Sequence, residues 1–136
     1  MELIVNNLSN RFGEKLILDH LSFSMQSGDF MALVGSSGSG KSTILRLIAG
    51  LDQPSSGSIT VDGTPVSGPG PDRGMVFQKY SLYPWLNAAE NVAFGMRLQR
   101  MKAAEIKERT AYFLEVVGLS DAATKLPREL SGGMQQ

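Results

Sequence analysis

A loop made only of glycine and serine joins a short apolar segment to a segment with helical periodicity. Residues 35–40 read Gly-Ser-Ser-Gly-Ser-Gly, and Lys41, Ser42 and Thr43 follow directly. Glycine lets the backbone curl so that its N–H groups converge on one anion, because no Cβ blocks the approach. A helix that begins at Lys41 directs the positive end of its dipole at the same place. The segment therefore predicts a site for phosphate groups.

The spacing of these residues is that of the Walker A motif, which binds nucleoside triphosphates with Mg²⁺. We expect Lys41 to contact the β- and γ-phosphates, Ser42 to be a ligand of Mg²⁺ and Thr43 to donate to a phosphate. The alternative is a plain turn between a strand and a helix, but such a match arises by chance in a chain of this length at roughly half a per cent. The expected nucleotide-binding residues of the loop are Gly35, Ser36, Gly38, Ser39, Gly40, Lys41, Ser42 and Thr43.

Apolar runs and turn residues predict how this loop is positioned. The runs at 30–34 and 74–77 are short and unalternating, which is typical of parallel strands buried on both faces. Asp62-Gly63 predicts a tight hairpin between two further strands. The helix after the loop is expected to be largely buried, because apolar residues surround most of it, namely Ile44, Leu45, Leu47 and Ile48.

After residue 78 the pattern becomes helical. Asn87 and Glu90 form a predicted capping box that opens a helix to about residue 98, and a second helix is expected over 103–117. Ile106, Thr110, Phe113, Leu114 and Val117 share one face of that second helix. The predicted fold class is α/β, with an antiparallel β part, a partial parallel core sheet and a helical subdomain. We expect a nucleotide-binding part over 1–86 and the helical subdomain over 87–136.

Charge and composition exclude several functions. Thirteen basic residues balance thirteen acidic residues, so there is no electrostatic case for a nucleic-acid partner. The chain has no cysteine, which excludes disulfides and thiolate chemistry. No segment approaches the ~18 apolar residues that cross a bilayer, and no secretion signal is recognisable. We expect a cytoplasmic chain that acts at a membrane only through a partner.

The segment 130–136, Leu-Ser-Gly-Gly-Met-Gln-Gln, resembles the signature motif of ATP-binding-cassette (ABC) ATPases. The whole chain is similar to that family in its order of Walker A, Gln78 at a predicted strand end, helical insert and signature. The resemblance implies a P-loop NTPase that uses ATP and Mg²⁺ and forms a homodimer with a second ATPase subunit. It implies that Ser131, Gly132 and Gly133 contact the γ-phosphate held by the opposite subunit, and that Gln78 contacts Mg²⁺ or the attacking water. The family commonly has Gln where this chain has Met134.

Two aromatic features take their expected roles from the same resemblance. Phe12 lies where the family stacks an aromatic ring on adenine, although a core position is the alternative. Residues 80–86, Tyr-Ser-Leu-Tyr-Pro-Trp-Leu, correspond to the docking surface for a membrane permease, with folding back into the helical part as the alternative. Residues 68–78 and this loop look most like the ATPases of nitrate, sulfonate and taurine importers. A solute-binding protein is then an indirect partner, at the inner face of the cell membrane.

In the family, the Walker B strand and a switch histidine follow the signature, and this sequence ends before them. We therefore expect residues 1–136 alone to be inactive in ATP hydrolysis. The strands expected at 30–34 and 74–77 should be parallel but not neighbours, because the family places two later strands between them. A soluble ABC ATPase without a permease, or a non-catalytic nucleotide-binding fragment, are the alternative readings. The transported solute is not fixed by this sequence.

Overall fold

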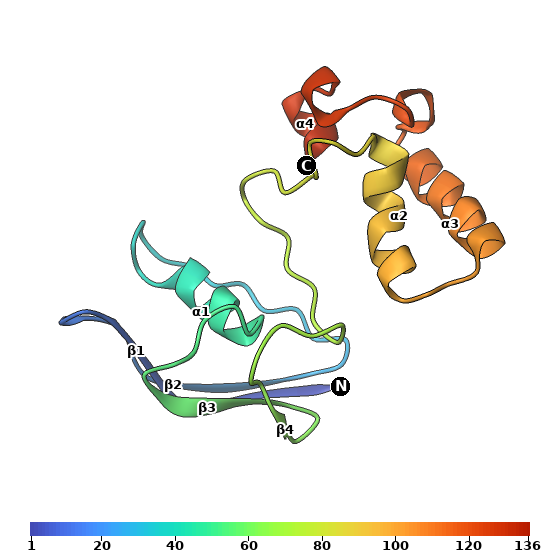
Figure 1. The fold of residues 1–136 in the computed structure, drawn as a ribbon. Coiled ribbons are helices and arrows are strands. Elements are labelled where there is room, and N and C mark those ends of the chain that lie inside the picture. The colour runs from blue at the N-terminus through green and yellow to red at the C-terminus, as the bar shows by residue number, and fades with distance from the viewer. The chain divides into compact units, whose positions relative to one another are not determined.

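An antiparallel sheet of four strands forms the first part of the chain in the computed structural model, which describes residues 1–136 (Figure 1). Side by side, the strands are β2 (Lys15–Gln26), β1 (Glu2–Phe12), β3 (Ser56–Val61) and β4 (Thr64–Pro65). The hairpin predicted at Asp62-Gly63 is confirmed and joins β3 to β4. Both turn residues have positive φ, as the tight turn of a hairpin requires.

Helix α1 (Lys41–Ile48) packs on this sheet and ends as predicted, with Gly50 in the left-handed region directly after the cap. Its buried residues are Ile44 and Leu47, and 49% of Leu45 is exposed. The expectation that the helix is buried nearly all round is therefore wrong for Leu45, because only the sheet side of α1 has a packing partner. The core of this part consists of Val5, Leu8, Leu18, Ile44, Leu47 and Ile59.

The second part of the chain is helical, with α2 (Ala88–Leu98), α3 (Ala103–Val116), α4 (Gly132–Gln135) and the 3-10 turns η1 (Ser120–Ala122) and η2 (Pro127–Glu129). The predicted capping box is confirmed. Glu90 N donates to Asn87 Oδ1 at 2.8 Å, and Asn87 N donates to Glu90 Oε2 at 2.9 Å. These two bonds satisfy main-chain donors at the start of α2.

The core of the helical part consists of Ala88, Leu114, Ala122 and Leu130. On α3, Thr110 and Leu114 are buried as expected, whereas Phe113 and Val117 are exposed. The predicted apolar face was therefore too wide. Only one side of α3 packs against the core of the helical part, so a residue on the flank of the predicted face, such as Phe113, stays exposed.

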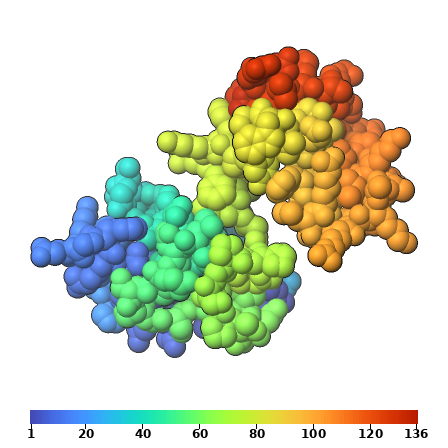
Figure 2. All heavy atoms as spheres, in the orientation of Figure 1, coloured from blue at the N-terminus to red at the C-terminus, as the bar shows by residue number.

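The chain divides into two compact units, residues 1–76 and 77–136, whose atoms Figure 2 shows coloured along the chain. This division falls earlier than the boundary after residue 86 that the sequence suggested. Gln78 and the loop 80–86 thus belong to the same unit as the helices. No helix has both the length and the apolar character that crossing a membrane requires.

Residues 30–34 and 74–77 do not form strands, so the expected parallel core sheet is not formed. The antiparallel part of the predicted fold is confirmed. A strand needs a neighbour to accept and donate its main-chain hydrogen bonds, and neither segment pairs with any of the four strands. Their side chains lie open, with 93% of Phe30 and of Val34 and 83% of Val76 exposed.

Candidate nucleotide-binding site

The phosphate loop, residues 35–40, is curled against its own start and against β2. Gly38 and Gly40 have φ of 79° and 93°, a region that favours glycine. A Cβ on Gly40 would lie 2.8 Å from Cδ2 of Leu18, and a Cβ on Gly35 would lie 2.6 Å from Oγ of Ser39. The loop therefore needs glycine for its backbone shape and, at these two positions, for space.

The amino group of Lys41 lies inside the loop. Its Nζ donates to the carbonyl of Gly35 at 2.8 Å, to the carbonyl of Ser36 at 2.7 Å and to Oγ of Ser39 at 3.3 Å. An ammonium group has three donors, and all three are directed into the loop here. The positive charge is thus held at the place where the loop backbone and the start of α1 meet.

The start of α1 adds further positive character. The first turn of the helix has no acidic residue, and the N-cap is Gly40, so no side chain occupies the end of the helix. Ser42 is exposed and Thr43 half-buried within that first turn. Because the first N–H groups of a helix have no partner within it, this end can hold an anion. The prediction that a helix begins at Lys41, directly after the loop, is confirmed.

An ion pair that sequence reasoning missed fixes the other end of α1. Arg46 donates to both carboxylate oxygens of Asp52, with Nε at 2.6 Å and Nη2 at 2.8 Å. The hydrogen bond from Arg46 holds the pKa of Asp52 below its ordinary value, while partial burial acts in the opposite direction. Arg46 in the last turn of a predicted helix was the available signal, since basic residues favour that position.

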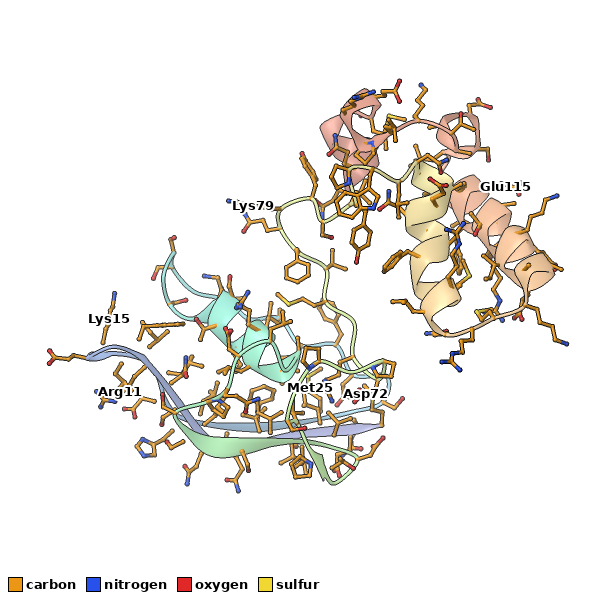
Figure 3. All side chains as sticks on the ribbon, viewed as in Figure 1. Arg11, Lys15, Met25, Asp72, Lys79 and Glu115 are labelled. Atoms are coloured by element: carbon orange, nitrogen blue, oxygen red, sulfur yellow. The ribbon has the colours of Figure 1, made fainter.

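Phe12 is the last residue of β1 and pairs with Lys15 at the tip of the β1–β2 hairpin. Figure 3 labels Lys15 and Arg11 at this end of the sheet. The side chain is 58% exposed and takes no part in the core of the sheet unit. The alternative of a core phenylalanine is therefore wrong. Phe12 thus lies outside the core at the hairpin tip, with its ring exposed.

The signature residues form the short helix α4 and its two ends. Ser131 is the N-cap as predicted, although its side chain makes no capping hydrogen bond; its carbonyl accepts from Gln135 N at 3.1 Å. The side chain of Gln135 holds the preceding turn by donating to the carbonyls of Pro127 and Leu130, each at 2.9 Å. Met134, which stands where the family commonly has Gln, packs against the core of the helical unit.

The aromatic loop, residues 80–86, is partly folded back and partly exposed. Tyr83 packs on Phe94 of α2 with ring centroids 4.4 Å apart, and Trp85 packs on Tyr83 at 5.6 Å. Trp85 is nevertheless 72% exposed and Tyr80 55% exposed. Gln78, which precedes the loop, is exposed as well. The alternative that all of these aromatic residues fold into the helical part is therefore wrong.

Asn91 holds the aromatic loop and was missed in the sequence. Its Oδ1 accepts from Tyr83 N at 2.8 Å. Its Nδ2 donates to the carbonyls of Tyr83 at 3.2 Å, Leu86 at 2.9 Å and Asn87 at 3.0 Å. One amide thus satisfies four main-chain groups around the start of α2. The only signal was its position one turn after Asn87, where a short polar side chain can reach back over the helix start.

Comparison with known proteins agrees with this architecture. Residues 18–136 match the family model described as ABC transporter. In fold, 98% of the chain aligns with 65% of the dimeric ATP-binding cassette MJ0796 bound to ADP and Pi, at a TM-score of 0.84 and 31% identity. The class is that of P-loop nucleotide-binding proteins, with part of the ABC ATPase fold. The chain belongs to the ABC transporter family, in which it represents an ATP-binding subunit.

Three curated relatives are ATP-binding proteins of importers. The chain is 50% identical to the nitrate import protein NrtD of Synechocystis over 100% of its own length and 53% of the relative's. It is 44% identical to the sulfate/thiosulfate import protein CysA of Mycobacterium tuberculosis, over 98% and 39%. It is 45% identical to the taurine import protein TauB of Sinorhizobium fredii, over 90% and 46%. The chain thus spans about half the length of these relatives or less.

Proposed function

We propose that this chain is part of the ATP-binding, energy-coupling subunit of an ABC importer for small anions such as nitrate, a sulfonate or taurine. The observation that carries the proposal is the position of the Lys41 amino group within the curled loop at the start of α1. A charge held there, beside free helix N–H groups, suits the phosphates of ATP. The three relatives are import proteins for nitrate, sulfate/thiosulfate and taurine, which supports an importer of small anions.

The loop fits a nucleotide with Mg²⁺. Glycine at positions 38 and 40 keeps the curled backbone free of side chains, and the exposed hydroxyl of Ser42 is the kind of hard oxygen that Mg²⁺ accepts beside phosphate oxygens and water. When bound, Mg²⁺ neutralises the charge that develops on the transferred phosphoryl group. In this proposal Lys41 and Thr43 hold phosphates. The main-chain N–H groups that complete the cradle belong to Gly35, Ser36, Gly38, Ser39 and Gly40.

Two further residues complete the proposed nucleotide contacts. The open ring of Phe12 stacks on adenine, which the exposure of the hairpin tip permits. Gln78 contacts Mg²⁺ or orients the attacking water, through an amide that is exposed in its own unit. Divided by these proposed contacts rather than by packing, the chain has a nucleotide-binding part over 1–86 and a helical subdomain over 87–136.

A second copy of the chain completes each ATP site in this proposal. Ser131, Gly132 and Gly133 are exposed, and their main-chain groups are open to a phosphate held by the partner. The dimeric state of the cassette MJ0796 supports this arrangement. Homodimerisation would then place two nucleotides between two subunits, each bound by the phosphate loop of one copy and the signature of the other.

The permease is proposed to dock on the aromatic loop, which would place the protein on the cytoplasmic face of the membrane. An exposed tryptophan on a loop that Asn91 fixes offers a preorganised apolar contact. The solute-binding protein acts only indirectly, and no nucleic acid takes part.

Calorimetric titration of the purified chain with ATP in the presence of Mg²⁺ tests the core of the proposal. Saturable binding that is lost in excess ADP competition, and that shifts the chain from monomer to dimer in sedimentation, is expected. Absence of binding would overturn the nucleotide site. Binding without an associated membrane permease in affinity purification would favour a soluble ABC ATPase, and binding without dimerisation would favour a non-catalytic fragment.

A further inference from the structure

Tyr80 of the aromatic loop lies directly against Gly132 of the signature. A Cβ built on Gly132 would lie 2.5 Å from the hydroxyl oxygen of Tyr80 and 3.5 Å from its Cζ. The hydroxyl end of the Tyr80 side chain therefore occupies this space, and a side chain at position 132 would require Tyr80 to move. This contact joins two segments that are about fifty residues apart in the sequence, within the same compact unit.

The two signature glycines differ in this respect. A Cβ on Gly133 would meet no atom within 4 Å. Neither glycine has a positive φ, and both lie within α4, so backbone conformation does not require glycine at either position. Within this chain, a side chain at 132 would thus have to displace the hydroxyl end of Tyr80, while nothing in the chain requires glycine at 133.

A second contact links the same two segments. Nε2 of Gln136 donates to the carbonyl of Phe77 at 3.3 Å. Gln78 lies between Phe77 and Tyr80, so the segment that carries it is attached to the signature on both sides. Both contacts therefore bring the segment that carries Gln78 against the signature segment.

We propose that Tyr80 is a positioning residue: its hydroxyl sets the place of the signature segment 131–136 relative to Gln78 and the aromatic loop. The role in nucleotide binding rests on the function proposed above. In the assembled protein, Tyr80 connects the proposed permease-docking loop to the residues that face the partner's ATP. Glycine at 132 then serves this internal contact, whereas glycine at 133 serves the close approach of the partner's nucleotide.

Thermal unfolding without nucleotide tests the contact independently of function. The single tryptophan, Trp85, lies in the same unit and reports its unfolding by fluorescence. Gly132→Ala is expected to lower the midpoint by about 4 °C. Tyr80→Phe, which removes only the hydroxyl, should restore most of this loss in the double variant, because the remaining Cζ lies at ordinary contact distance. Gly133→Ala should not lower the midpoint, since alanine favours a helix more than glycine does.

Equal midpoints for Gly132→Ala and wild type, or no restoration by Tyr80→Phe, would overturn the proposal. If Gly132→Ala does not fold, a double variant with Tyr80→Phe that does fold would support the contact in the same way. Hydrogen exchange provides a local readout: Tyr80→Ala should speed exchange of the amides of 132–136 and leave the α3 amide of Leu114 unchanged. Tyr112→Ala, an exposed tyrosine on α3, is the matched control and should not alter the signature amides.

ATP-dependent dimerisation distinguishes the two glycines in function. Both Gly132→Ala and Gly133→Ala are expected to weaken it about tenfold or more, but Tyr80→Phe should rescue only the substitution at 132. Rescue of both variants, or of neither, would overturn the positioning role. If the wild-type chain itself does not dimerise with ATP, the proposed function fails, and the unfolding comparison alone then decides the Tyr80 contact.

Discussion

The side chain of Lys41 reaches back across the phosphate loop and donates to the carbonyl of Gly35 at 2.8 Å, so that the last and first parts of the motif are in direct contact. The bond closes the loop around a positive charge. A phosphate that binds there must draw the ammonium group away from main-chain carbonyls, or share it with them. Lys41 therefore holds the shape of the loop and, in the proposed function, also binds the anion.

Replacing Lys41 with alanine is expected to weaken ATP binding by a factor of roughly ten to a hundred. The loss of a charge-assisted contact with phosphate costs about 1.5–3 kcal/mol. Calorimetric titration of both proteins measures the ratio directly. Lys102→Ala, an exposed lysine at the start of α3, serves as control and should bind like the wild type. Equal affinities for wild type and Lys41→Ala would remove Lys41 from the site.

The two positive-φ glycines of the loop should differ in their tolerance of alanine. Both substitutions strain the backbone, but only a Cβ on Gly40 also meets the side chain of Leu18, at 2.8 Å. Gly40→Ala should therefore reduce the free energy of unfolding by about 1–3 kcal/mol more than Gly38→Ala. Denaturant titrations followed by far-ultraviolet circular dichroism give this difference. The same loss for both variants would show that the loop end does not pack on β2.

Asn91→Ala should destabilise the helical unit by about 1–3 kcal/mol, because Tyr83 N and the carbonyl of Leu86 lose their partner, while the carbonyls of Tyr83 and Asn87 keep main-chain donors. Unfolding followed by Trp85 fluorescence measures the loss. The emission of the folded variant should also change, since Trp85 packs on Tyr83, which Asn91 holds. Gln99→Ala, at the exposed end of α2, is the control. A variant as stable as this control would contradict the role of Asn91.

Trp85→Ala tests the aromatic loop as a docking surface. Because the side chain is 72% exposed and has one aromatic neighbour, the stability of the unit should fall by no more than about 1 kcal/mol. Co-purification with a membrane permease, quantified by mass spectrometry, should fall strongly. Tyr112→Ala removes an exposed aromatic residue elsewhere in the unit and should retain the permease. Undiminished co-purification of the Trp85 variant would place the docking surface somewhere else.

The Arg46–Asp52 pair predicts a pH dependence. Its hydrogen bond lowers the pKa of Asp52 in the folded chain below the ordinary value, which is about 4. The unfolded chain thus takes up the proton first as pH falls, so the pair stabilises the fold above about pH 4 and the contribution is lost as pH drops through the lower folded pKa. The pair is partly exposed, so the effect should be small.

Comparison of wild type with Asp52→Asn isolates this effect from the other carboxylates. The difference in unfolding free energy should be constant near neutral pH and shrink below about pH 4. Chemical denaturation at a series of pH values gives both curves. A difference that grows towards acid pH would mean that the pKa shift of Asp52 has the opposite sign.

Local features were predicted well from the sequence, since each depends on a few neighbouring residues. The start of the helix at Lys41, the Asn87–Glu90 capping box and the Asp62-Gly63 hairpin are all confirmed. In each of them, conformational preference and hydrogen bonds within one turn decide the structure. The family followed from two such motifs in the correct order, which needed no knowledge of packing.

Features that depend on partners distant in the sequence were decided only by the tertiary structure. The apolar run 30–34 has the composition of a buried strand, yet a strand exists only where a neighbour completes its main-chain hydrogen bonds. The open side of Leu45 depends on which face of α1 has the sheet beneath it. The contact between Tyr80 and Gly132 depends on a meeting of two segments that no local pattern encodes. The sequence by itself determined where the phosphate loop and the helix after it lie, and packing across the chain decided which segments became strands and which side chain lies against position 132.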